Sequence, residues 1–319
     1  KIIPYKILIN ITDLCNSRCE FCDIWKIKPE NEINLNDINT SLKGIEKDIY
    51  WISLSGGEIT LVNYFYELID SYKANLPNLK IIAFTTNALA PKKALAYAKY
   101  IKDKGLDCLI TVSLDGDEET HDKLRGIKGN YQKCVKLYEE LKKNDILVHY
   151  GITVSEKNQE FIMRDYKKFS KEIKAVTFVH SEGIYNKKNS YQNDSSIIDS
   201  LKHILKNYKI DKISEIIEWM HIKLSIKFLK DQRKKNLIPC DVLNTSIHIN
   251  PNGDLKPCMF MPKVGNIREE SIEDILSNDE TKKSKSLIKK NNCPKCWMNC
   301  YSPHSMMQHP IKSLLKSIL

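Results

Sequence analysis

Apolar residues recur in short runs through the first 180 residues of the chain, separated by stretches of mixed polarity. The runs are rich in Ile, Leu, Val and Thr, which favours β-strands. We expect six strands, at 6–11, 51–55, 80–85, 109–114, 147–154 and 175–179. Between them, apolar residues follow helical spacing at about 36–47, 62–75, 91–104, 131–144 and 159–172. This alternation predicts βαβ units, and therefore an α/β fold with a parallel sheet and right-handed crossovers.

The alternation stops near residue 190. Two long helical patterns follow, at about 194–208 and 211–235, and then two short strands flank the turn signal Asn252-Gly253. We therefore expect three parts: an α/β unit over 1–190, a helical connection over 191–235, and a cysteine-rich unit over 236–319. The final segment, HPIKSLLKSIL, is amphipathic at helical spacing, and we expect it to pack on the protein's own core and not on a membrane.

Composition and charge narrow the classes of protein. Of the 319 residues, 42% are apolar and 28% are charged, which excludes wholesale disorder. No apolar run is long enough for a transmembrane helix, and the N-terminal segment has no signal-peptide pattern, so we expect a cytoplasmic protein. The net charge of +10 gathers in 227–235 and 282–290, which we interpret as solvated helix faces, with an acidic partner as the alternative. No motif indicates nucleic-acid binding.

The ten cysteines are grouped. Because the cytoplasm keeps thiols reduced, such grouping favours metal ligation over disulfides. Cys108 and Cys134 stand alone among apolar residues, and we expect both to be inert core thiols. The others form an N-terminal and a C-terminal group: Cys15, Cys19 and Cys22, and Cys240, Cys258, Cys293, Cys296 and Cys300.

The N-terminal triplet is one thiolate short of a closed site. Structural zinc and a ferredoxin-type [4Fe–4S] cluster each take four protein ligands. Three thiolates on a four-iron cube leave one iron open to a ligand, and hence to chemistry. The triplet follows the first predicted strand, so it lies at the carboxyl edge of the sheet, where α/β folds place their active sites. An electron-transfer or scaffold protein, the other class of function considered, would supply all four ligands.

The segment NITDLCNSRCEFCDIW (10–25) resembles the signature of the radical S-adenosylmethionine (SAM) enzymes. The resemblance implies a partial (β/α)6, TIM-like barrel in which a [4Fe–4S] cluster binds SAM through its open iron. One electron from an external donor, such as a flavodoxin or a ferredoxin-like protein, then cleaves SAM. The resulting 5′-deoxyadenosyl radical abstracts hydrogen from a substrate, while the protein positions and shields the cofactor.

Motifs at the ends of the next strands resemble the same family. SLSGGEIT (53–60) resembles the GGE motif that contacts the SAM amino group, with Ile in place of the usual Pro after the Glu. TTNA (85–88) resembles the TTNG that often ends strand three. SLDGDEETHDKLRG (113–126) resembles the strand-four segment, in which Ser113 and Asp115 approach the ribose of SAM or the substrate and Arg125 is a candidate for the SAM carboxylate. GITVSEKN (151–158) resembles the segment that contacts adenine. The resemblance assigns SAM or substrate contacts to Gly56, Gly57, Glu58, Thr86, Asn87, Ser113, Asp115, Arg125, Thr153 and Val154.

The second cysteine group, C-x12-G-x4-C followed by C-x2-C-x3-C, resembles the SPASM/twitch extension that holds auxiliary iron–sulfur clusters. Five cysteines without a C-x5-C spacing are too few for the full SPASM pattern, so we expect one auxiliary [4Fe–4S] cluster. Cys240, Cys258, Cys293 and Cys296 match its ligands best. Cys300 would then be a spare thiol, which we interpret as a further ligand or a bystander, with a hydrogen-atom donor to a substrate radical as the alternative. A structural zinc is the alternative to the cluster.

The substrate stays open between two classes. Twitch and SPASM proteins modify ribosomal peptides and other natural products, or dehydrogenate and epimerise sugars, aminoglycosides, lipids and other small molecules. Only 14 residues precede Cys15, so no N-terminal leader-binding domain is expected, which weakens the peptide reading. His180, Ser181 and Glu182 follow the sixth predicted strand and are candidates for substrate contact, with ordinary loop polarity as the alternative.

Overall fold

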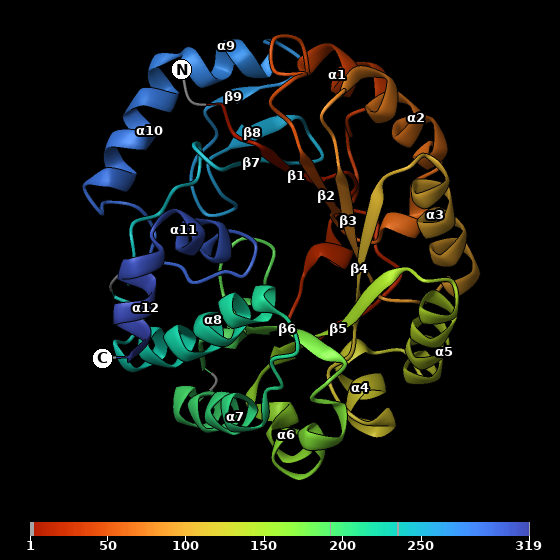
Figure 1. The fold of residues 1–319 in the computed structure, drawn as a ribbon, viewed down its shortest axis with the longest axis vertical. Helices are drawn as coiled ribbons and strands as arrows, with labels where there is room; N and C mark the ends of the chain where they lie inside the picture. Colours follow the sequence, from red (N-terminus) through yellow and green to blue (C-terminus); the bar gives the residue numbers. More distant parts are fainter. Residues whose placement is uncertain (1–2, 192, 235, 319) are drawn as a thin grey trace.

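A computed structural model describes residues 3–191, 193–234 and 236–318 of the chain. Its centre is one nine-stranded sheet in the order β6-β5-β4-β3-β2-β1-β7-β8-β9 (Figure 1). All six predicted strands are present, with ends that differ by up to two residues, and they pair in parallel in chain order. They are β1 (Lys6–Asn10), β2 (Trp51–Ser55), β3 (Ile81–Thr86), β4 (Asp107–Ser113), β5 (Leu147–Val154) and β6 (Ile173–Phe178). The predicted α/β partial barrel is confirmed.

Helices cover the outer face of this curved sheet (Figure 1). They are α1 (Leu35–Ser41), α2 (Phe65–Asn75), α3 (Pro91–Asp103), α5 (Asn130–Lys143) and α6 (Gln159–Asp165). α1 and α6 are shorter than predicted, and α6 continues as a 3₁₀ helix at Tyr166–Phe169. Helix α4 (Glu118–Arg125) was not predicted, because it is short and strongly polar. Asp117 caps its first turn, and Gly126, at φ 67°, ends it in the left-handed conformation.

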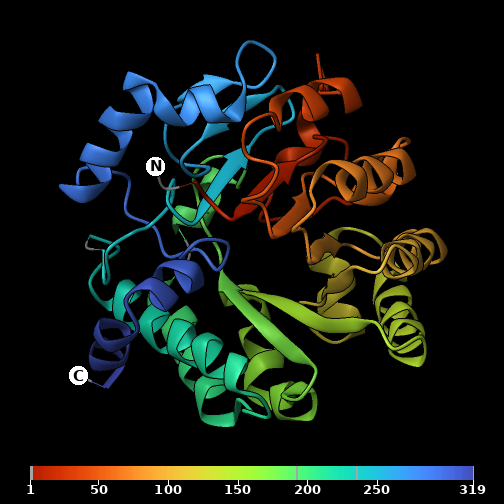
Figure 2. The same cartoon turned by 45° about the horizontal axis from the view of Figure 1, so that its top comes forward.

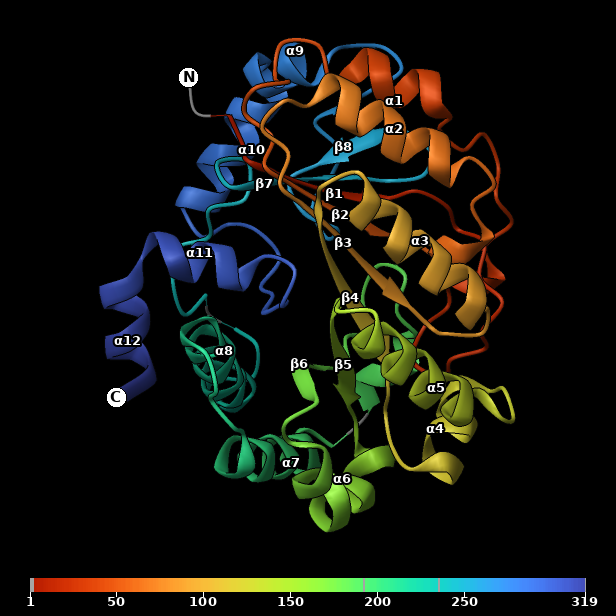
Figure 3. The ribbon, with the colours of Figure 1, turned by 45° about the vertical axis from the view of Figure 1, so that its right-hand side comes forward.

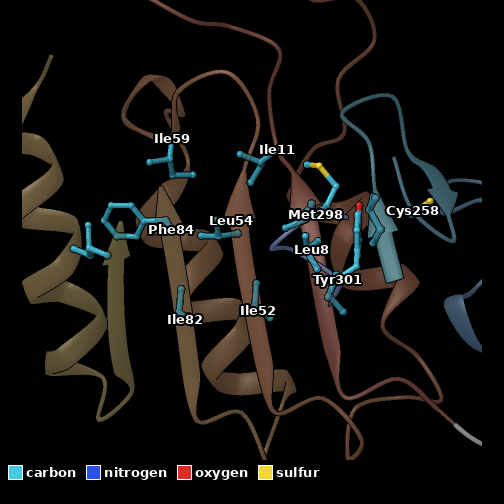
Figure 4. Packing of buried hydrophobic residues seen from close by; sticks show 14 of the residues in the cluster. Leu8, Ile11, Ile52, Leu54, Ile59, Ile82, Phe84, Cys258, Met298 and Tyr301 are labelled. Atoms are coloured by element: carbon cyan, nitrogen blue, oxygen red, sulfur yellow. The ribbon is translucent and has the colours of Figure 1, made fainter. Parts of the chain in front are cut away.

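The strands divide their side chains between two faces. On β2 and β3, Ile52, Leu54, Ile82 and Phe84 are fully buried, and Phe84 packs edge-on against Phe65 of α2 (Figure 4). This row therefore faces the helices, and the alternate residues face the interior of the barrel. Cys108 and Cys134 are also buried, as expected.

The C-terminal part is joined to the barrel through the sheet. Helices α7 (Asp194–Asn207) and α8 (Ile213–Lys230) follow β6, and the predicted hairpin is present as β7 (Ser246–Ile249) and β8 (Asp254–Lys256). Strand β7 pairs in parallel with β1, so the hairpin and β9 (Gly265–Asn266) extend the barrel sheet (Figure 2). The sequence did not indicate this pairing. The boundaries near 190 and 235 remain a prediction.

Helices α9 (Ile272–Ser277), α10 (Asp279–Lys289), α11 (Ser302–Gln308) and α12 (Pro310–Ile318) complete the chain. Helix α11 lies between the β1–β7 side of the sheet and α8 (Figure 3). Lys6 Nζ lies 2.7 Å from His304 Nε2, and Ser302 Oγ lies 2.9 Å from His221 Nδ1 of α8. The C-terminal segment therefore crosses the open side of the barrel.

Two expectations, about the basic segment 227–235 and about the C-terminal helix α12, need correction. Helix α8 ends at Lys230, and Gln232 and Arg233 have positive φ, so the basic segment 227–235 is not one continuous helix; residue 235 lies outside the described residues. Helix α12 packs on α8 and α11, but it buries Ser313 and leaves Ile311 75% exposed. Its apolar stripe therefore does not face the core. No helix in the described ranges is long and apolar enough to cross a bilayer.

Candidate active site

The loop with Cys15, Cys19 and Cys22 follows β1 and lies at the carboxyl ends of the parallel strands. Its backbone is bound on two sides. The Arg18 amide donates to the carbonyl of Arg125 at the end of α4, at 3.0 Å, and the Glu58 amide donates to the Leu14 carbonyl at 2.8 Å. The loop is therefore held between α4 and the segment that follows β2.

The two glycines of the SGGE segment allow this close packing. Gly56 has φ 131°, which side chains rarely adopt, and a Cβ there would collide with the Thr12 carbonyl. A Cβ on Gly57 would collide with the Leu14 carbonyl. Both glycines thus fit the loop against β2, a role that sequence reasoning did not assign to them. Their contact with SAM remains a prediction.

Glu58 joins the ends of β2 and β3. The residue is 2% exposed; Oε1 accepts from the Thr60 amide, the Thr60 hydroxyl and the Thr86 hydroxyl, and Oε2 accepts from the Asn87 amide at 2.8 Å. Burial raises the pKa of Glu58, although these hydrogen bonds lower it. Oε1 is saturated, and Oε2 keeps one acceptor position for a further donor.

Asn87 reaches the cysteine loop directly. Its Nδ2 donates to Oδ1 of Asn16, which stands between Cys15 and Cys19, at 2.9 Å. Its carbonyl accepts from Nδ2 of Asn130 on α5 at 2.8 Å. Thr86 and Asn87, both predicted from the TTNA segment, therefore set the position of Glu58 and of the loop.

A buried ion pair borders the triplet. Arg125 Nε lies 2.6 Å from Asp115 Oδ2, and Arg125 Nη1 lies 3.6 Å from Cys19 Sγ. Burial lowers the pKa of Arg125, but the charges of Asp115 and Cys19 raise it by more. The net effect is a raised pKa, so the guanidinium stays charged. Arg125 therefore contacts Asp115 and Cys19, and its contact with the SAM carboxylate stays a prediction.

The remaining predicted SAM contacts lie at the ends of β4 and β5. The Thr153 amide donates to Asp115 Oδ1 at 2.8 Å, and Ser113 is buried. Val154 is fully buried, and its carbonyl accepts from the Val179 amide at 3.0 Å. Asp115 and Thr153 thus join β4 to β5 beside the loop, and the SAM contacts of Ser113, Thr153 and Val154 stay predictions.

The segment after β6 closes over the loop. Tyr185 forms a backbone bridge with Cys22, and Asn189 Nδ2 donates to the carbonyls of Phe21 and His180 at 3.0 and 2.7 Å. Burial lowers the pKa of His180 to about 3, and its Nε2 has no hydrogen-bond partner among the described residues. His180 was predicted as a candidate contact, whereas Tyr185 and Asn189 carried no signal beyond their place after a strand.

The C-terminal cysteines form a second site. Cys240, Cys258, Cys293 and Cys296 line one cavity together with Trp297, Met298 and Tyr301. Burial, together with the neighbouring Cys258 and Cys293, raises the pKa of Cys240 to about 12. Among the described residues, no three His, Cys, Asp or Glu side chains converge on a single-ion site; these four thiols surround a cavity.

Cys300 stands apart from these four thiols. Cys300 is half-buried and does not line their cavity; desolvation raises the pKa of its thiol, and the charge of Lys6 lowers it. Burial raises the pKa of Tyr185, and the charges of Cys300 and Cys22 add to this effect. Cys300 therefore lies on the side of the C-terminal segment that faces the N-terminal triplet.

Two family models match the chain: the radical SAM superfamily over residues 9–167, and an iron–sulfur cluster-binding domain, SPASM, over residues 240–301. The antilisterial bacteriocin subtilosin biosynthesis protein AlbA of Bacillus subtilis (strain 168) is 24% identical over 284 residues, which cover 86% of this chain and 60% of AlbA. The chain thus spans less than two thirds of that relative.

A cysteine-type anaerobic sulfatase-maturating enzyme of Clostridium novyi (strain NT) is 26% identical over 324 residues, which cover 90% of this chain and 84% of that enzyme. Among solved structures, native anSMEcpe with bound AdoMet and Kp18Cys peptide aligns with a TM-score of 0.66 at 18% identity. The alignment covers 89% of this chain and 83% of that one, and it shows the same fold.

The two domains carry a SAM-binding [4Fe–4S] cluster, SAM and auxiliary iron–sulfur ligation. The residues present fit these groups, since three thiols share one loop beside a charged guanidinium and four more surround one cavity. The pair of domains and the two sets of thiols indicate that the protein is an enzyme. The chain belongs to the radical SAM superfamily, in the subgroup whose members carry a C-terminal SPASM domain.

Proposed function

We propose that this protein is an oxidoreductase that cleaves SAM reductively and modifies a peptide or a related natural product. The observation that carries the proposal is the separation of the cysteines into a set of three beside Arg125 and a set of four around the C-terminal cavity. Bound there, SAM and its cluster supply a 5′-deoxyadenosyl radical that abstracts a hydrogen atom from the substrate. A one-electron donor protein is required as a partner.

The chain's own residues organise the first site. Cys15, Cys19 and Cys22 hold the cluster, and the Arg125 guanidinium offsets the negative charge of its thiolates. Glu58 Oε2 has one acceptor position left, which suits an ammonium group such as that of SAM. The proposed SAM contacts at Gly56, Gly57, Thr86, Asn87, Ser113, Asp115 and Thr153 all lie on this edge of the sheet.

We assign one auxiliary [4Fe–4S] cluster to Cys240, Cys258, Cys293 and Cys296, because a four-iron cube takes four thiolates and these four share a cavity. Cys300 then remains for substrate. Its absence from the lining of that cavity and its electrostatic interaction with Tyr185, which also interacts with Cys22, support a role as hydrogen-atom donor to a substrate radical.

A peptide substrate is supported by two relatives, one named for bacteriocin biosynthesis and one for sulfatase maturation. The solved anSMEcpe structure with a bound peptide shares this fold. A sugar, aminoglycoside or lipid substrate is the alternative. Neighbouring genes separate the two, since a short precursor-peptide gene favours the peptide and glycosyltransferase or lipid genes favour the alternative.

Anaerobic reconstitution with iron, sulfide, SAM and dithionite tests the proposal. We expect 5′-deoxyadenosine from the reconstituted protein and none from a Cys15→Ala/Cys19→Ala/Cys22→Ala variant. A protein that holds full iron and sulfide but forms no 5′-deoxyadenosine would contradict the enzymatic function.

A further inference from the structure

Lys6 is a buried cation in the interior of the barrel. It is the first residue of β1, and it is only 5% exposed. Its neighbour Ile7 pairs in register with Ile52, whose row faces the helices, so Lys6 faces the interior. Lys6 Nζ lies 2.7 Å from His304 Nε2 of α11, and it forms no ion pair with a carboxylate of the described residues. A buried charge costs free energy unless an opposite charge meets it, so this position favours an anionic ligand.

The surroundings of Lys6 define a single positive charge. Burial lowers the pKa of Lys6 to about 8, which leaves the ammonium protonated at neutral pH. Because an ammonium only donates, His304 Nε2 accepts, and the ring proton lies on Nδ1, 2.8 Å from the Tyr5 hydroxyl. Burial, together with the charge of Lys6, lowers the pKa of His304 to about 3, so the ring is neutral. Desolvation raises the pKa of Cys300, so its thiol adds no negative charge at neutral pH.

Two further donors stand beside Lys6 in the sheet. Trp51 of β2 and Ser246 of β7 are its register partners on the two sides, so the three side chains point to the same face. Lys6 Nζ lies 4.7 Å from the centre of the Trp51 ring. The indole N–H of Trp51 and the hydroxyl of Ser246 are buried, and neither has a hydrogen-bond partner among the described residues. This Lys6 row (Trp51, Lys6 and Ser246) therefore offers three donors to one acceptor group.

The barrel interior beside the Lys6 row is open to solvent. Thr85 belongs to the central strand β3 and is exposed, although both of its neighbours in the strand are buried. Trp51 and Ser53 of β2 are half-buried on the same face. Strand β1 rises by about 13 Å from Lys6 to Asn10, and the loop with the three thiols follows. A ligand anchored at the row therefore extends toward that loop, and its anchored group lies well away from the atom that reacts.

We propose that the Lys6 row binds a carboxylate of the substrate, and that the enzyme thereby selects acidic substrates. The inference rests on the proposed function and names the anchoring group of its substrate. One ammonium matches the single charge of a carboxylate, whereas a phosphate dianion would leave one negative charge unpaired. The indole and hydroxyl donors on either side suit the two carboxylate oxygens.

The place of the row in the fold also favours a substrate over a protein partner. Helix α11 crosses the open side of the barrel and holds Lys6 through His304, so a folded partner would not reach the row (Figure 3). In a peptide, the carboxylate is either a side chain of Asp or Glu or the C-terminus. The experiment distinguishes these two sources.

The test uses four single variants, each reconstituted anaerobically and supplied with SAM. Lys6→Met removes the charge, Trp51→Phe removes the indole N–H but keeps an aromatic ring, and Ser246→Ala removes the hydroxyl. Lys174→Met of β6 is the matched control, because Lys174 is a largely buried strand lysine that already pairs with two carboxylates. Iron and sulfide content and thermal unfolding show first that each variant is folded.

Binding of four small probes is measured by ligand-observed NMR. N-acetylaspartate α-amide carries only a side-chain carboxylate, N-acetylalanine only a C-terminal carboxylate, and N-acetylalanine amide neither; inorganic phosphate is the fourth probe. We expect a carboxylate to bind the wild type about 10- to 100-fold more tightly than the amide, and Lys6→Met to lose this preference. Trp51→Phe and Ser246→Ala should each lose about 2- to 10-fold, and Lys174→Met should stay within about twofold. The tighter of the two carboxylates identifies the source.

Equal binding of the carboxylate and amide probes by the wild type would overturn the proposal. So would equal carboxylate binding by Lys6→Met and Lys174→Met. Phosphate that binds more tightly than either carboxylate, and that Lys6→Met loses, would also overturn it, because the row would then serve a phosphorylated ligand. If Lys6→Met does not fold, unchanged affinity in both Trp51→Phe and Ser246→Ala would overturn the proposal.

None of these binding measurements needs SAM cleavage. Absence of 5′-deoxyadenosine after reduction of the wild type would overturn the proposed function, whereas loss of carboxylate binding in Lys6→Met would still show that the row holds an anion of this class.

Discussion

The loop with the three N-terminal thiols and the cavity with the four C-terminal thiols differ in the charge that surrounds them. The loop lies beside the buried Arg125–Asp115 ion pair. Asn87 links the loop to the buried carboxylate of Glu58, because it hydrogen-bonds both Asn16 and Glu58. The cavity is lined by Leu, Ile, Val, Met, Trp and other uncharged side chains. Among the described residues of its lining, the only ionisable groups are the four cysteine thiols and the hydroxyl of Tyr301.

From this difference we infer that the N-terminal loop binds a charged ligand, whereas the C-terminal cavity encloses a cluster that the protein ligates fully. Buried charges cost free energy unless they are paired, so a protein keeps them where they meet a charged group. An apolar lining instead stabilises a fully ligated cluster and the local fold around it. The predictions below test the contrast, from the largest expected effect to the smallest.

The triple replacement Cys15→Ala/Cys19→Ala/Cys22→Ala should abolish SAM cleavage and leave the C-terminal cluster in place. With two [4Fe–4S] clusters, iron and sulfide should fall from about eight to about four per chain. Metal analysis and 5′-deoxyadenosine measurement check both. Bound zinc in place of the remaining iron would show that the C-terminal cavity is not a cluster site.

The replacement Cys258→Ala should remove the auxiliary cluster and unfold the surrounding segment, because Cys258 is buried and metal ligation is coupled to folding in cysteine-rich units. Cys300→Ala, the matched variant, should keep full iron content and change only the product. Limited proteolysis, iron analysis and mass spectrometry of the product distinguish them. Loss of four irons in Cys300→Ala would make Cys300 a ligand.

The replacement Asp115→Ala should destabilise the protein by about 3–5 kcal/mol, because it leaves the buried Arg125 charge without its partner. Denaturant unfolding of the cluster-free protein measures the effect. The exposed pair Lys282–Asp279 is the control, since Asp279→Ala should cost below about 1 kcal/mol. Similar losses of unfolding free energy in the two variants would mean that the buried Arg125–Asp115 pair contributes no more to stability than an exposed pair.

The replacement Glu58→Gln should lower SAM affinity by about 10- to 100-fold, the loss of a charge-assisted hydrogen bond worth roughly 1.5–3 kcal/mol. Because the carboxylate also accepts hydrogen bonds from Thr60, Thr86 and Asn87, some loss of stability should accompany it. Thermal unfolding and SAM titration of cluster-loaded protein separate the two effects. Reduced stability with unchanged SAM affinity would restrict Glu58 to a structural role.

Local pattern was enough for much of the molecule. Alternating apolar runs specify β1 to β6 and the helices between them, because side-chain periodicity alone distinguishes strand from helix. The spacing of Cys15, Cys19 and Cys22 within one loop is a property of the chain, and so is the position of each motif after a strand. Glu58, Thr86 and Asn87 meet for the same reason, since parallel neighbouring strands end at one edge.

The sequence pattern did not predict contacts between segments that are far apart in the chain. The sequence by itself determined the strands of the barrel, the triplet and the order of the motifs, because each depends on residues close together in the chain. Only the tertiary structure decided that β7 joins β1, that Arg125 turns to Asp115 and Cys19, and that Cys300 leaves the other four thiols to face Lys6. Each of these contacts joins distant segments whose pairing follows from packing and charge neutralisation in three dimensions. The order of residues along the chain shows neither of these two effects.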